Sequence, residues 1–60
     1  MSKTAIVALF EAMFILTDLR VILRRTAPHH ALGAGEREEV RALIEGLEKR
    51  VDVLKRELLA

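Results

Sequence analysis

The apolar residues of the C-terminal half recur every three or four positions, which is the period of one helix face. They are Val40, Ile44, Leu47, Val51, Leu54 and Leu58. Spacings that alternate between four and three define the heptad seam of a coiled coil, with Ile44, Val51 and Leu58 at a positions. The d positions are then Val40, Leu47 and Leu54. This pattern predicts a helix over about residues 36–59 with one narrow apolar stripe.

The N-terminal half is more apolar, and its apolar residues surround almost the whole of a second predicted helix. Within residues 5–16 only Glu11 is polar. The polar residues that lie seven positions apart form one narrow stripe: Thr4, Glu11, Asp18 and Arg25. We expect Glu11 to be exposed on this stripe. The alternative is a buried carboxylate that pairs with an arginine of another chain.

This N-terminal helix, expected at about residues 3–26, carries apolar side chains on both sides of its polar stripe. On one side lie Val7, Phe14 and Val21, with Ile15 and Ile22. On the other side lie Ile6, Leu9, Met13, Leu16 and Leu23. The C-terminal helix offers a single stripe and can cover only one of these faces. The other face therefore has to meet another chain or lipid.

Proline and glycine mark a break between the two helices. Pro28 cannot continue an upstream helix, and Gly33 and Gly35 suit left-handed or flexible backbone. We therefore expect a connection at residues 27–35 and an antiparallel helical hairpin. Thr26 is also a candidate cap for one short helical turn before Gly33.

A chain of sixty residues forms at most one small domain, here residues 1–60. Such a chain buries only about 60% of the surface that its unfolded form exposes. It has no cysteine and no Cys/His spacing that would hold a structural metal. We therefore expect an all-α fold in which the hairpin pairs with a second copy as a homodimeric four-helix bundle. The expected interface residues are Ile6, Leu9, Phe10, Met13, Phe14, Leu16, Val21, Leu23, Val40, Ile44, Leu47, Val51, Leu54 and Leu58.

Gly46 interrupts the C-terminal helix away from the predicted apolar stripe, at a cost near 1 kcal/mol relative to alanine. With Ala42 and Val53 it forms a small-residue face where another helix can approach closely. A tolerated surface glycine is the equal alternative. A parallel coiled coil of this helix alone is disfavoured, because Arg50 at g would face Lys55 at e of the partner.

Charge is nearly balanced, since ten Lys and Arg residues stand against nine Asp and Glu. Bulk charge therefore does not predict binding to nucleic acid or to a membrane surface. Arg20, Arg24 and Arg25 form a basic end to the N-terminal helix, where they complement the helix dipole. Doubled in a dimer, the same arginines are candidate nucleic-acid contacts. No aromatic residue lies among them to stack a base, so such binding would depend on shape and salt.

No combination of residues predicts catalysis. Ser2 is the only serine, and His29 and His30 have no carboxylate at the spacing of a catalytic triad. We therefore expect no enzymatic activity, no cofactor and no metal. Neighbouring histidines on a helix point about 100° apart, so they chelate poorly within one chain. Only an oligomer that brings several connections together would build a histidine cluster that binds metal or responds to pH.

Three classes of function fit this sequence. The first is a small non-enzymatic module for oligomerisation or protein–protein interaction, an adaptor or regulator in the cytoplasm. The second is an RNA- or DNA-binding regulator built as a dimer of hairpins, with the three arginines as contacts. The third is a membrane-associated subunit, because residues 5–23 are about long enough to cross a bilayer. Glu11, Asp18 and Arg20 oppose insertion of that segment.

Overall fold

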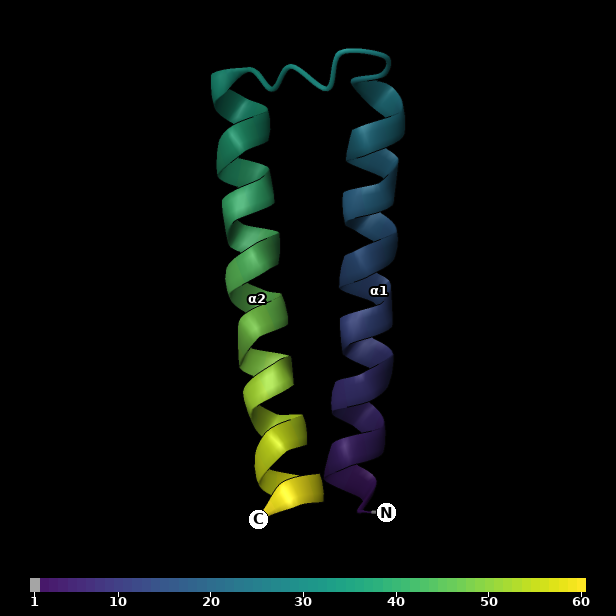
Figure 1. The fold of residues 1–60 in the computed structure, drawn as a ribbon, viewed down its shortest axis with the longest axis vertical. Helices are drawn as coiled ribbons and strands as arrows, with labels where there is room; N and C mark the ends of the chain where they lie inside the picture. Colours follow the sequence, from purple (N-terminus) through teal and green to yellow (C-terminus); the bar gives the residue numbers. More distant parts are fainter. Residues whose placement is uncertain (1) are drawn as a thin grey trace.

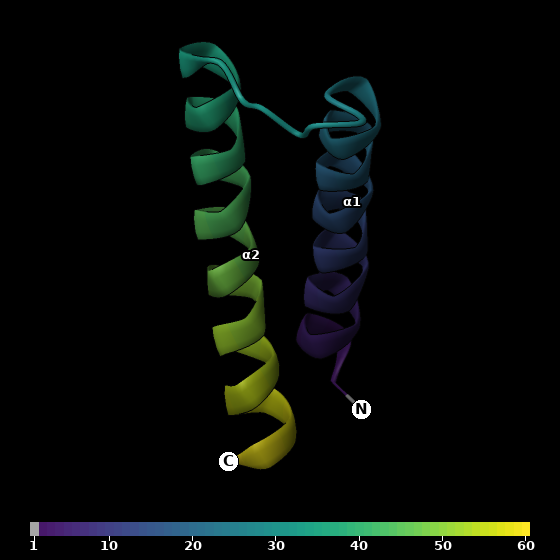
Figure 2. The same cartoon turned by 45° about the horizontal axis from the view of Figure 1, so that its top comes forward.

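The computed structural model describes residues 2–60 and shows two helices that pack side by side. α1 spans Lys3–Arg25, α2 spans Ala34–Leu59, and the described residues form no strand. The connection lies at one end of the molecule and both chain ends lie at the other (Figure 1), and the helices stay adjacent when the molecule is turned (Figure 2). The pair measures 40 × 16 × 14 Å. The expected all-helical antiparallel hairpin is confirmed.

Side-chain caps fix both ends of α1. At its N-terminus, Ser2 Oγ accepts a hydrogen bond from the Ala5 N–H at 3.0 Å. At its C-terminus, Thr26 Oγ1 donates to the Ile22 carbonyl at 2.9 Å, and the Thr26 N–H donates to the same oxygen at 3.0 Å. One turn does follow Thr26, since the His30 N–H donates to the Thr26 carbonyl at 2.8 Å. The Thr26 side chain does not cap this turn but bonds back to α1, and the turn ends at His30. Thr26 ends α1, and residues 26–30 form turns.

The connection differs from the sequence-based expectation in where the backbone turns left-handed. Neither Gly33 nor Gly35 has a positive φ; His30 does, at 55°. Histidine tolerates this conformation better than most side chains do. Gly33 is instead the N-cap of α2, and its N–H donates to Glu36 Oε1 at 3.2 Å. Gly35 lies inside the first turn of α2, which begins at Ala34 instead of near residue 36.

The contact between the helices is built mainly from small residues of α1. The buried side chains Ala5, Ala8 and Ala12, named here the alanine line, share one face with buried Ile22. That face lies beside the polar stripe. It includes Ile15 and Ile22 of the first apolar side, but Val7, Phe14 and Val21 of that side are exposed. The half-buried residues of α1 and α2 complete the contact: Ile15, Leu19, Glu36, Val40, Leu43, Gly46, Leu47, Arg50, Val53 and Leu54.

α2 is rotated about its axis relative to the predicted seam. The d positions are half-buried toward α1, but the a positions Ile44, Val51 and Leu58 are 40%, 40% and 48% exposed. Leu43 and Arg50 take their place on the other flank of the d positions. Within the hairpin, α1 therefore contacts the predicted heptad seam at its d positions and leaves its a positions exposed.

Gly46 explains this rotation, because it gives α2 a flank without a side chain. A Cβ added at Gly46 would lie 3.5 Å from Ile15 Cδ1. The glycine is therefore not a surface position away from the contact. It has a packing role, as one of the two interpretations proposed, and the helix that approaches it is α1 of the same chain.

Candidate interaction surface

Outside its contact with α2, most of the circumference of α1 carries large apolar side chains that stay exposed in the hairpin. Nine of them are 40–71% exposed. We name this surface the outer face of α1: Ile6, Val7, Leu9, Phe10, Met13, Phe14, Leu16, Val21 and Leu23. Contiguous exposed apolar patches of this kind mark interaction sites on small proteins. All eight α1 residues expected at an interface belong to this set, and Val7 is an additional member.

The outside of α2 is different in character. Its exposed positions are mostly charged, and the line of Ile44, Val51 and Leu58 is the main apolar exception. A hollow beside this line is formed by side chains of both kinds: Ile44, Leu47, Glu48, Val51, Asp52 and Lys55. The hairpin therefore presents an apolar helix and a charged helix to its surroundings, with one apolar line on the charged helix.

Ion pairs and hydrogen bonds tie the two helices together at both ends. Near the chain ends, Ser2 Oγ donates to Glu57 Oε1 at 2.6 Å. Near the connection, Arg25 lies 3.6 Å from a Glu36 carboxylate oxygen and 3.4 Å from one of Glu39. These polar contacts set the register in which α1 runs along α2.

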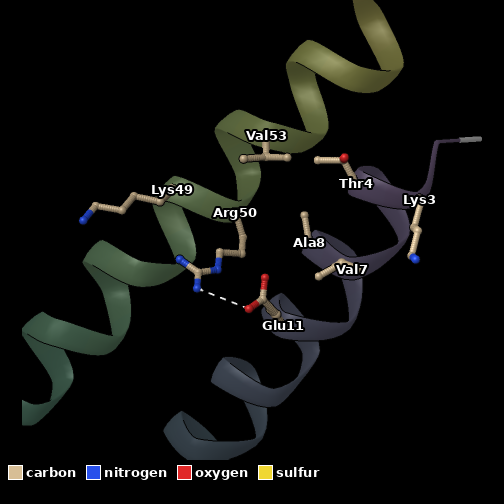
Figure 3. A pocket seen from close by; sticks show the side chains of 8 residues that line it. All are labelled: Lys3, Thr4, Val7, Ala8, Glu11, Lys49, Arg50 and Val53. Atoms are coloured by element: carbon tan, nitrogen blue, oxygen red, sulfur yellow. Dashed lines mark hydrogen bonds and ion pairs between the residues drawn. The ribbon is translucent and has the colours of Figure 1, made fainter.

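A third polar contact lies between these ends. Arg50 Nη2 lies 3.4 Å from Glu11 Oε2, beside an open cavity between the two helices (Figure 3). The Arg50 Nε is buried and has no hydrogen-bond partner among the described residues. Glu11 is thus exposed on the polar stripe, as expected. The arginine beside it belongs to the same chain and not to a second one as in the alternative interpretation.

The cavity at this contact is ≈ 420 Å³ in volume and open to solvent at its mouth. It is lined by Lys3, Thr4, Val7, Ala8, Glu11, Lys49, Arg50 and Val53. Its lining combines basic, acidic and apolar side chains from both helices, as Figure 3 shows. Within residues 2–60 no three His, Asp or Glu side chains lie close enough together to hold a metal ion.

We expect Arg25→Ala to lower the free energy of unfolding by about 0.2–1 kcal/mol more than Arg24→Ala does, because exposed ion pairs contribute little. Arg24 is the matched control, since it lies on the same turn and forms no ion pair among the described residues. Urea denaturation followed by circular dichroism measures both changes. The difference should shrink in high salt, which screens exposed charges. A difference that salt leaves unchanged would contradict an electrostatic role for Arg25.

The three arginines proposed as nucleic-acid contacts do not form one cluster with a common role. The Arg25 side chain forms ion pairs with Glu36 and Glu39. Arg20 and Arg24 are exposed, and their side chains form no hydrogen bond or ion pair with residues 2–60. His29 and His30 are both exposed in the connection.

No protein-family model matches this chain, and no curated protein and no solved structure is significantly similar to it. Neither α1 nor α2, which together contain nearly all the described residues, combines the length and the apolarity that crossing a membrane requires.

Proposed function

We propose that this chain is a small non-enzymatic oligomerisation module, an adaptor or regulator that acts by the contacts it makes through the outer face of α1. The observation that carries this proposal is the set of nine exposed apolar side chains on one helix. Complete burial of such a side chain is worth about 1.5–3 kcal/mol. A second chain that covers even part of this surface would therefore stabilise the hairpin considerably.

The accessible surface of the hairpin exceeds the value expected for its mass by about the area that one partner buries in a standard interface. Its accessible surface is 4734 Å². A folded monomer of 6.8 kDa has roughly 4,000 Å² by the usual scaling of surface with mass. The excess of roughly 700 Å² by that scaling is close to the area of about 800 Å² that each partner buries in a standard interface. A homodimer, and with it a four-helix bundle, is the simplest assembly that removes this excess.

We expect the untagged chain to elute as a stable homodimer with twice its mass of 6.8 kDa. Light scattering coupled to size-exclusion chromatography measures this mass in detergent-free buffer at two chain concentrations. The single-chain mass at both concentrations would contradict the proposal. Aggregation that detergent reverses would instead favour an α1 that lies against lipid.

The same preparation tests the nucleic-acid alternative. Because Arg25 is paired with acidic residues of α2, only Arg20 and Arg24 remain as candidate phosphate contacts on α1. We therefore favour the protein–protein contact. A raised ratio of absorbance at 260 to that at 280 nm in the purified protein would favour nucleic acid. Cytoplasmic location is part of the proposal, since Glu11 and Asp18 interrupt the apolar surface of α1.

A further inference from the structure

The groove between the two helices has two edges, and the edges differ in chemistry. One edge holds the contact between Glu11 and Arg50, and we name it the polar edge. On α1, Leu9, Leu16 and Leu23 lie seven residues apart and form a line on the side of the alanine line away from Glu11. On α2, Ile44, Val51 and Leu58 form a matching line on the side away from Arg50.

Both lines therefore border the same edge, opposite the polar edge, and we name these six residues the apolar edge. Each line has the seven-residue spacing that lets apolar side chains interlock between helices. The side chains of the apolar edge are 40–52% exposed. Each helix thus carries one line of apolar residues with heptad spacing that the contact between α1 and α2 leaves partly exposed.

We propose that a second copy of this chain docks on the apolar edge, so that the two lines of each copy form the core of a four-helix bundle. This inference rests on the proposed function. It narrows the surface of α1 to three residues of the outer face, Leu9, Leu16 and Leu23, and adds the line on α2. A second copy fits because the same seven-residue spacing on both helices makes the edge self-complementary, as a two-fold interface requires. The excess exposed area is also close to one half of a standard dimer interface.

Charge sets the direction in which the two copies meet. Arg20 follows Leu16 by one helical turn, and Arg37 lines a hollow together with Ile44. Both arginines lie near the connection and have no acidic partner among the described residues. Two copies with their connections at the same end would bring four such cations together, and like charges across an interface are costly. The connections therefore lie at opposite ends of the bundle.

Matched charge substitutions test the apolar edge. Val51→Glu and Leu16→Glu place a carboxylate on it, whereas Phe14→Glu places one on the outer face of α1 away from it. All three side chains are exposed in the hairpin, by 40%, 52% and 71%. We expect Val51→Glu and Leu16→Glu to have the single-chain mass in light scattering, and Phe14→Glu to remain a dimer. Circular dichroism shows whether each variant stays helical.

The outcomes separate the inference from the proposed function. A dimer that survives Val51→Glu and Leu16→Glu but not Phe14→Glu would overturn the apolar edge and leave oligomerisation through α1 intact. Loss of the dimer in all three variants would likewise overturn the restriction to this edge. A single-chain mass for the unchanged sequence would remove the proposed function itself.

A distance measurement tests the direction without disturbing the interface. The chain contains no cysteine, so Ala31→Cys carries a single spin label in the exposed connection. Connections at opposite ends predict a distance between labels close to the 40 Å length of the hairpin. A distance of half that length or less would overturn the proposed direction. Glu45→Cys, near the middle of α2, is the control label, and it should report a short distance in the dimer.

Discussion

Replacing Ile22 with alanine is expected to lower the free energy of unfolding by about 2–5 kcal/mol, the usual cost of truncating a buried isoleucine. Ile22 is 1% exposed and is the one large side chain that residues 2–60 bury completely. The side chains of the alanine line are small, so they cannot fill the volume that truncation of Ile22 would leave between the helices. Urea denaturation at fixed chain concentration measures this change, because association shifts apparent stability.

Val21→Ala is the matched control for this prediction. Val21 precedes Ile22 on the same helix and is 49% exposed on the outer face of α1. It also lies off the apolar edge, so the proposed dimer should retain it at the surface. We expect a change within about 0.5 kcal/mol, as for most surface substitutions. Equal losses for the two variants would show that α1 does not present Ile22 to α2.

Gly46 should respond in opposite directions to a small and a large side chain. Gly46→Ala adds a Cβ at 3.5 Å from Ile15 Cδ1, which is ordinary contact distance. It also removes the helix penalty of glycine, so we expect stabilisation of up to about 1 kcal/mol. Gly46→Leu places several more atoms against Ile15 and should destabilise the hairpin by about 1–3 kcal/mol through overpacking.

Thermal and urea unfolding of both variants, at matched concentrations, provide the test of this pair. Ala42→Leu is the control for size, because Ala42 is exposed on the same helix one turn earlier. It should leave stability nearly unchanged. Stabilisation by both Gly46 substitutions would mean that Gly46 faces solvent and that the helices pack through another face.

The existence of the two helices could be predicted because its signals are local. The heptad spacing and the break at Pro28 each depend only on residues that are close together in the chain. The caps at Ser2 and Thr26 set the bounds of α1. The left-handed residue could not be predicted. Gly33 and Gly35 are better suited to positive φ than His30, but the chain places Gly33 at the N-cap of α2, where φ is negative.

The face through which the helices meet is a non-local property, and the sequence pattern did not identify it on α1. α1 is apolar almost all round, so periodicity does not distinguish one face from another. The helices meet through the face that lets their backbones approach most closely. Ala5, Ala8 and Ala12 allow a closer approach than leucine or phenylalanine would, and Gly46 does the same on α2. Three of the four fully buried side chains are therefore alanines, and larger side chains complete the contact half-buried around them.

The sequence predicted that much of α1 would stay exposed, because this helix is apolar on almost every side. The same distribution gave no indication of which face packs against α2. A helix with apolar residues on every side has more such surface than one neighbour covers, so a large uncovered remainder was inevitable. Which part of that remainder meets another chain depends on the position of α2. The apolar edge could be identified only from the structure, in which the contact between Glu11 and Arg50 marks the opposite edge of the groove.

The alanine line also has a consequence for how much of this protein a cell would hold in folded form. Only three alanines and one isoleucine are fully buried among the described residues of one chain, so in the proposed dimer a large part of the folding free energy comes from association. Folded protein would then increase with the square of the free chain concentration at low abundance. Chains made in small amounts would remain open to proteolysis, and expression level would act as the switch between a degraded peptide and an assembled bundle.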